Sequence, residues 1–123
     1  MKIPVLRLKN ILLTSIQVDL TDEDALNFQE DLLKAVQIND ADGVIIDITA
    51  LDVVDSFLAR VLNETAVMTK ILGAESVISG MQPDVALTLV EMGRELIGVS
   101  TAINLDHGME KLQALISKRA GGV

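Results

Sequence analysis

The sequence predicts an α/β fold with a mainly parallel sheet, an N-terminal antiparallel hairpin and four helices. Three observations lead to this prediction. Two apolar runs open the chain with only Lys9 and Asn10 between them, which leaves no room for a helix. After them, apolar runs of strand length alternate with amphipathic segments of helical length. The length of 123 residues, without a linker or repeat, favours a single domain over residues 1–123.

The first two strands are expected at residues 4–8 and 11–18. Both segments are rich in the aliphatic residues that suit a pleated strand. Their short connection predicts antiparallel pairing, because parallel neighbours need a long crossover. The chain should therefore open with a hairpin.

The first helix is expected to begin at Thr21. This residue can cap the first turn, and Asp24, three residues later, can complete a capping box. Apolar residues then recur at helical spacing as far as Val36. Residues 39–43 are rich in Asn, Asp and Gly, so a loop should follow the helix.

The central strand is expected at residues 44–48. This run is continuously apolar, which indicates burial on both faces, as in parallel sheets. The second helix is expected over residues 57–72, and Gly73 should end it. Met68 and Leu72 belong to the stripe that should face the core.

A further strand is expected at residues 76–79, followed by a third helix with Pro83 at its first position. Val90, Gly93 and Leu96 belong to the predicted apolar face of this helix.

The last strand is expected at residues 100–105, and Asp106 should cap the last helix. Leu112 is among the residues of that helix that should point inward. Residues 118–123 should form a fraying end.

Composition excludes several classes of function. The formal net charge of −8 and an aromatic content of 2% disfavour nucleic-acid binding, which relies on basic patches and stacking side chains. The chain has no cysteine, so disulfides, thiolate nucleophiles and cysteine-based zinc sites are absent. No apolar run approaches the roughly 20 residues of a membrane span. The N-terminus lacks a signal-peptide pattern, so a cytoplasmic location is expected.

No catalytic residue, metal site or cofactor is predicted. His107 is the only histidine and has no Ser or Cys partner in a catalytic context. Asp40 and Asp42 precede the central strand, whereas Asp52 and Asp55 follow it. The two pairs should lie roughly 15–20 Å apart. These acidic residues therefore indicate a solvated surface rather than a magnesium site, which needs convergent oxygens.

The junction between the central strand and the second helix is the candidate functional site. One of Asp55 and Ser56 should cap the helix, and the other should lie in its first turn. A phosphate on Ser56 would meet backbone N–H groups and the positive end of the helix dipole. It would also add about −1.5 to −2 charges beside Asp52 and Asp55. Thr88, on the predicted third helix, is expected to be a second exposed hydroxyl.

Two stretches resemble the STAS domain family, the family of sulfate transporters and anti-sigma-factor antagonists. They are residues 47–57, which contain Asp55-Ser56-Phe57, and residues 80–90, which begin Gly-Met-Gln-Pro-Asp. The resemblance covers essentially the whole chain and is greatest for the scaffold proteins of the stressosome. A receiver domain also alternates strands and helices, but the opening hairpin and the absence of a lysine after the last strand disfavour it.

A single-domain anti-sigma-factor antagonist is the alternative within the family. Such antagonists usually carry Asp-Ser-Ser-Gly-Leu or a similar stretch at the junction. This chain has Phe57 and Leu58 after Ser56, without the glycine. It also has a Gln-Pro-Asp helix start at residues 82–84, which the antagonists generally lack.

The resemblance to the scaffolds implies a non-enzymatic protein. Its implied partners are RsbR-type STAS paralogues, an RsbT-type serine/threonine kinase that it sequesters, and an RsbX-type phosphatase; self-association is also expected. The paralogues carry an N-terminal sensory domain, and because the first strand begins by residue 4 the chain is expected to be the minimal scaffold.

The resemblance also assigns roles to residues. Ser56 matches the main phosphorylation site, and Thr88 matches a phosphothreonine of the paralogues rather than of the scaffold. The expected partner-binding residues are Asp52, Asp55, Ser56 and Phe57.

Overall fold

The protein is described by a computed structural model that covers residues 2–91 and 99–121. Its elements occur in the predicted order of strands and helices. They are β1 (Val5–Leu8), β2 (Ile11–Ser15), α1 (Asp22–Asn39), β3 (Gly43–Asp47), α2 (Ser56–Ile71), β4 (Glu75–Ser79), α3 (Pro83–Glu91), β5 (Ser100–Ala102) and α4 (Leu105–Ala120).

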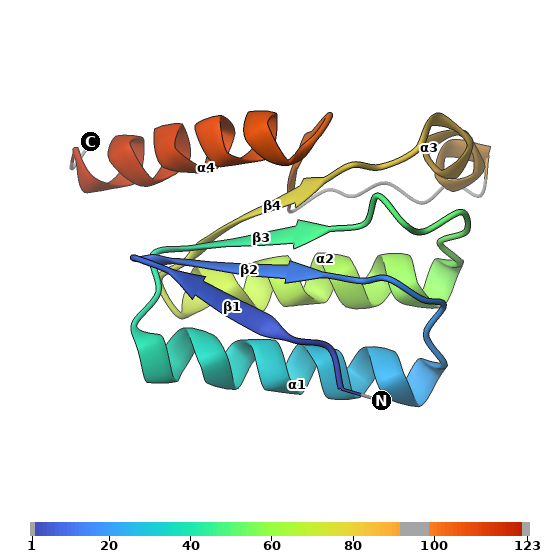
Figure 1. Cartoon of the computed structure of the whole chain (residues 1–123), viewed down its shortest axis with the longest axis horizontal. Helices are drawn as coiled ribbons and strands as arrows, with labels where there is room; N and C mark the ends of the chain where they lie inside the picture. Colours follow the sequence, from blue (N-terminus) through green and yellow to red (C-terminus); the bar gives the residue numbers. More distant parts are fainter. Residues whose placement is uncertain (1, 92–98, 122–123) are drawn as a thin grey trace.

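The strands form one sheet in the order β1-β2-β3-β4-β5. β1 pairs with β2 antiparallel, and every other neighbouring pair is parallel. Figure 1 shows α1 and α2 on one side of the sheet and α4 on the other, with α3 beyond the ends of β3 and β4. The predicted fold class, with its N-terminal hairpin and four helices, is confirmed.

The central strand β3 is buried on both faces, as its unbroken apolar sequence predicts. Val44 and Ile46 belong to the main hydrophobic cluster with residues of α1 and α2. Ile45 belongs to a second cluster that includes Leu112 of α4. Consecutive side chains of a strand point to opposite faces, so β3 contributes to both layers of the core.

The start of α1 confirms the predicted capping box. The Asp24 backbone N–H donates to the Thr21 hydroxyl at 3.0 Å, and the Thr21 N–H donates to the Asp24 carboxylate at 3.3 Å. Both bonds satisfy N–H groups that a helix start would otherwise leave without partners.

Two expectations at the C-terminal end were wrong. The last strand stops at Ala102 instead of residue 105, and Asn104 rather than Asp106 caps α4. The Asn104 side chain accepts the His107 backbone N–H at 2.8 Å, and His107 Nδ1 accepts the Ile103 N–H at 3.2 Å. These bonds engage Ile103 and Asn104 in the helix start, and Asp106 lies in the first helical turn. The second strand also ends early, at Ser15 rather than residue 18.

The inward face of α2 differs from the predicted stripe. Met68 and Leu72 are 38% and 40% exposed, whereas Ala66 and Thr69 are buried. The Thr69 hydroxyl bonds to the Ala66 carbonyl and to Ser76, so this polar group can be buried with its hydrogen bonds satisfied.

The predicted apolar face of the third helix is only partly confirmed. Val85 and Leu89 are buried, but Val90 is 68% exposed. The expectations for Gly93 and Leu96 lie outside the described residues. Among the residues that the structure describes, no helix has the length and apolarity needed to cross a membrane.

Candidate functional site: the Ser56 corner

Residues 52–57, here called the Ser56 corner, connect the end of β3 to the start of α2. Asp55 is the N-cap of α2, and its side chain accepts the Leu58 backbone N–H at 2.8 Å. Ser56 is the first helical residue. The prediction that one of these two residues caps the helix and the other lies in its first turn is therefore confirmed.

Buried side chains hold the corner against the core. Leu51 and Val54 are 1% and 2% exposed, and the Leu51 N–H donates to the Ile48 carbonyl at 3.0 Å. Between these two anchors, Asp52 and Val53 are exposed. The loop therefore has a fixed path, with an acidic and an apolar side chain facing solvent.

The two candidate hydroxyls differ in their hydrogen bonding. Ser56 is exposed, and its hydroxyl makes no hydrogen bond to any residue that the structure describes. Thr88 is also exposed, but its hydroxyl donates to the Asp84 carbonyl at 2.9 Å. Phosphorylation of the Thr88 hydroxyl would break this bond, whereas no hydrogen bond to a described residue occupies the Ser56 hydroxyl. Thr88 lies on α3, so the structure does not place it within the Ser56 corner.

Arg60 adds a positive charge that the sequence interpretation missed. Its guanidinium lies 5.0 Å from the centre of the Phe57 ring, which is a cation–π distance. Its Nε also lies 3.9 Å from the Glu64 carboxylate. Arg60 follows Ser56 by four residues, the spacing of neighbours on one helix face. That spacing was the available signal, and it places a cation one turn from the hydroxyl.

A hollow beside the corner brings together the β2–α1 and β3–α2 loops. Its lining residues are Asp19, Leu20, Leu51, Val53, Asp55 and Leu58. Parallel neighbours end at the same edge of a sheet, which explains why the two loops meet. Sequence reasoning missed Asp19 and Leu20 as part of this surface. The hollow has acidic and apolar walls, which suit a protein partner with basic and apolar side chains.

The two pairs of acidic residues lie at opposite ends of β3, as predicted. Asp42 precedes the strand and contacts the Asn10 amide at 3.0 Å and Arg119 at 3.7 Å. Asp52 and Asp55 follow the strand. Within the described part of the chain, no three His, Cys, Asp or Glu side chains converge as metal ligands would.

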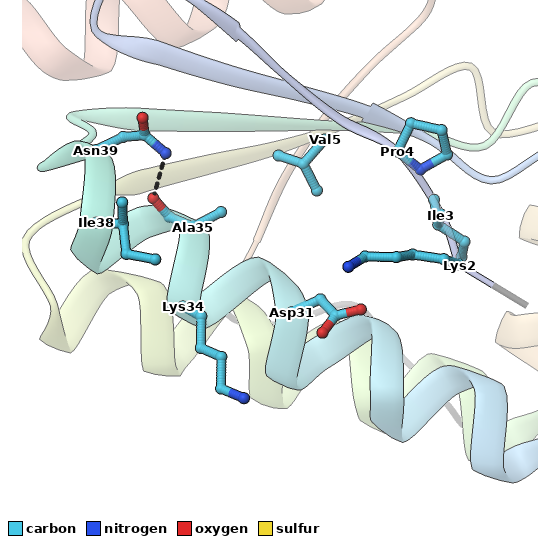
Figure 2. A pocket seen from close by; sticks show the side chains of 9 residues that line it. All are labelled: Lys2, Ile3, Pro4, Val5, Asp31, Lys34, Ala35, Ile38 and Asn39. Carbon is cyan, nitrogen blue, oxygen red and sulfur yellow. Dashed lines mark hydrogen bonds between the residues drawn. The ribbon is translucent and has the colours of Figure 1, made fainter.

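A separate groove lies between the N-terminal segment and α1 (Figure 2). Its lining residues are Lys2, Ile3, Pro4, Val5, Asp31, Lys34, Ala35, Ile38 and Asn39. Two of its polar groups are already engaged: Lys34 pairs with Glu30 at 3.0 Å, and the Asn39 amide donates to the Ala35 carbonyl at 2.8 Å. The lining has no nucleophile beside a general base, and it shares no residue with the Ser56 corner.

Comparison with known proteins gives a consistent result. The family model for the STAS domain matches residues 2–103. The structure is similar to that of a serine-to-glutamate variant of RsbS from Moorella thermoacetica, with a TM-score of 0.82 and 38% identity over 95% of this chain and 99% of that one. It is also similar to a chain in a structure of the stressosome, described as a signal integration and transduction hub. That match has a TM-score of 0.78 and 41% identity over 91% of this chain and 97% of the other.

A relative with a curated name is the RsbT co-antagonist protein RsbRA of Bacillus subtilis (strain 168). The two are 31% identical over 102 residues, which make up 83% of this chain. The match spans only 37% of the length of RsbRA.

Proposed function

This chain belongs to the STAS domain family, and from that premise we propose that it is a stressosome scaffold of the RsbS type. The observation that carries the proposal is 41% identity to a stressosome chain, with nearly full coverage of both chains. The identity of 38% to RsbS supports the same reading. The proposal takes residues 1–123 as one STAS domain that associates with itself and with RsbR-type paralogues.

The second part of the proposal concerns the kinase. The scaffold holds an RsbT-type kinase through the Ser56 corner, and the kinase then transfers the γ-phosphoryl group of ATP to Ser56 Oγ, releasing ADP and a proton. The exposed hydroxyl at the start of α2 supports this choice of acceptor. The new phosphate adds about −1.5 to −2 charges near Asp52 and Asp55, so a kinase contact on this surface weakens by like-charge repulsion. An RsbX-type phosphatase would reverse the change. The chain is thus a substrate, with no catalytic role of its own.

Phosphorylation of the wild-type chain and of two variants tests the kinase part. Incubation with an RsbT-type kinase and ATP should label the wild type and Thr88→Ala, and should not label Ser56→Ala. Ser56→Asp, which adds one negative charge, should bind the kinase less tightly than Ser56→Ala. Full labelling of Ser56→Ala, or unchanged kinase binding by Ser56→Asp, would contradict this part of the proposal.

Particle size tests the scaffold part against the alternative of an anti-sigma-factor antagonist. A scaffold mixed with an RsbR-type paralogue should form a particle of megadalton scale in light scattering. An antagonist should form only small complexes with an anti-sigma kinase, and this outcome would favour the alternative.

A further inference from the structure

The carboxylate of Asp47 lies at the point where β3 ends and the chain turns toward the Ser56 corner. Ser15 and Ser79 are its register partners on the two neighbouring strands. Their hydroxyls donate to this carboxylate at 3.3 and 2.9 Å, and the Thr49 hydroxyl donates to it at 2.8 Å. Bonds to a charged acceptor are stronger than neutral ones. Asp47 therefore fixes Thr49, the second residue after the strand.

Thr49 also lies against the turn that leads into α3. Gly80 in that turn has a φ of +79°, a conformation that glycine adopts more readily than other residues. A Cβ on Gly80 would lie 1.9 Å from the Thr49 hydroxyl oxygen. The backbone of the β4–α3 turn and the side chain of Thr49 are thus in direct contact, and a larger residue at position 80 would separate them.

Gln82 joins this contact to the start of α3. Its side-chain Nε2 donates to the Thr49 carbonyl at 2.9 Å. Its own carbonyl accepts the N–H groups of Val85 and Ala86 at 3.0 and 3.1 Å, which are the first bonds of the helix. One residue therefore both begins α3 and holds the start of the loop that presents Ser56.

We propose that Thr49 and Gln82 are positioning residues that couple α3 to the Ser56 corner. A loss of helical order in α3 would then loosen the loop that presents Ser56. The loop is held at Thr49 and, further on, at the buried Leu51 and Val54. The hydrogen bond from Gln82 to Thr49 is separate from the apolar packing, in which Leu51 and Val54 share a cluster with buried residues of α3. Loss of this bond should therefore loosen the first part of the loop without releasing the whole corner. This coupling deepens the proposed function, and only its effect on phosphorylation rests on that function.

The proposed coupling also predicts how a phosphate on Thr88 would affect the Ser56 corner. A phosphate on Thr88 would lie at helical spacing from Asp84 and from Glu91, four residues before and three after it. Like charges at these spacings destabilise a helix, and α3 is only 9 residues long. Modification of Thr88 would thus loosen Gln82, and through it the Ser56 corner.

Hydrogen exchange tests the coupling without a kinase. Gln82→Met keeps the length of the side chain and removes the donor to Thr49. Exchange of the Leu51 amide, which bonds to the Ile48 carbonyl within this loop, should become about five-fold faster, as loss of one hydrogen bond of average strength implies. The matched control is Gln113→Met. Gln113 is an exposed residue of α4, the helix that covers the face of the sheet opposite to α2 (Figure 1). Unchanged exchange in Gln82→Met, or an equal increase in the control, would overturn the proposal.

Coupling must also act in the reverse direction, because linkage is reciprocal. Thr49→Val removes the hydroxyl that bonds to Asp47 and keeps the shape of the side chain. The amides of Val85 and Ala86, at the start of α3, should then exchange faster than in the wild type. If Thr49→Val changes exchange only within its own loop, the two elements are independent and the proposal is wrong.

The kinetics of Ser56 phosphorylation by the kinase provide the third test of the coupling. A looser loop must be ordered when the kinase binds, so Gln82→Met should raise the KM for Ser56 labelling about five-fold and leave kcat nearly unchanged. Gln113→Met should alter neither constant. If the kinase does not label wild-type Ser56, the proposed function fails, and the exchange measurements still decide whether the coupling exists. Wild-type kinetics in a Gln82→Met protein that is labelled would overturn the link to phosphorylation.

Discussion

Asp55 satisfies a backbone donor at the start of α2 and also belongs to the acidic surface of the Ser56 corner. Its carboxylate accepts the Leu58 N–H at 2.8 Å. Loss of an N-cap side chain typically lowers stability by about 1 kcal/mol. Asp55→Ala should therefore lower the free energy of unfolding by about this amount, measured by urea denaturation with far-UV circular dichroism.

Asp52→Ala is the matched control for this prediction, since Asp52 is exposed and no hydrogen bond ties it to a described residue. It should change stability by less than about 0.5 kcal/mol. Equal losses in Asp52→Ala and Asp55→Ala would show that charge, and not capping, determines the effect.

Asp24 gives the start of α1 a pH dependence. Its carboxylate accepts the Thr21 backbone N–H and takes part in the capping box with the Thr21 side chain, and these bonds hold the pKa of Asp24 below its ordinary value. A lowered pKa in the folded state contributes stability above the unfolded-state pKa, about 3.9, and this contribution is lost as the pH falls through the folded-state value.

Asp24→Asn keeps an acceptor but cannot titrate. Its free energy of unfolding should fall less steeply than that of the wild type as the pH decreases from about 5 to about 2. Urea titrations at a series of pH values measure the slope, with Asp22→Asn as a control for the change in charge. A wild-type slope in Asp24→Asn would contradict the assignment.

At the scale of elements, α4 is attached to the sheet by a thin apolar layer. The cluster on this side consists of Ile11, Ile45, Val77, Ala102 and Leu112. Leu112 is the only large side chain of α4 that is fully buried among the described residues. A Cβ on Gly43 would lie 2.9 Å from either Leu112 methyl carbon, so helix and strand approach closely here.

Leu112→Ala should lower the free energy of unfolding by about 3 kcal/mol, within the range for buried leucines. The loss should be accompanied by faster hydrogen exchange throughout α4. Leu115→Ala, at a half-buried position, should have a smaller effect. Equal effects of the two substitutions would show that α4 is not held mainly by Leu112.

The elements show how far the sequence predicts this fold. Order and type were predictable because apolar runs and helical spacing mark them directly. The cap of α4 was not, because Asn104 and Asp106 are both good capping residues and only their hydrogen bonds decide between them. The inward face of α2 was missed in part, since burial of Thr69 depends on its bond to Ser76 in another element.

In the candidate site, too, local features were predictable from the sequence and contacts between elements were not. The places of Asp55 and Ser56 follow from local sequence and were predicted. The contacts of Asp47 with Ser15 and Ser79 depend on the register of three strands, which the sequence does not specify. The contact of Gln82 with Thr49 depends in addition on the path of two loops.

At the scale of the whole molecule, the net charge is −8 on 123 residues. Repulsion between these like charges lowers the stability of the folded state. The ion pairs among the described residues involve exposed or partly exposed side chains, as in Lys34–Glu30 and Arg60–Glu64. Exposed pairs of this kind contribute little to stability, because solvent screens their attraction. Screening by salt should therefore weaken repulsion more than attraction.

Thermal unfolding in increasing sodium chloride, from about 0.01 to 0.15 M, should show a rising Tm as the screening length falls from roughly 30 to 8 Å. Sucrose at equal osmolality controls for effects other than charge. A falling Tm would mean that the ion pairs outweigh the repulsion.

The position of Phe57 has an optical consequence. It is half-buried, it follows Ser56 directly, and the Arg60 guanidinium lies over its ring. The chain contains neither Trp nor Tyr, so its intrinsic fluorescence is very weak. Phe57→Trp would therefore place a single fluorophore next to the candidate phosphoryl acceptor, with a cation over its ring and no background from the rest of the protein. Its emission would report the charge state of the neighbouring side chain in real time, inside an assembly of many copies.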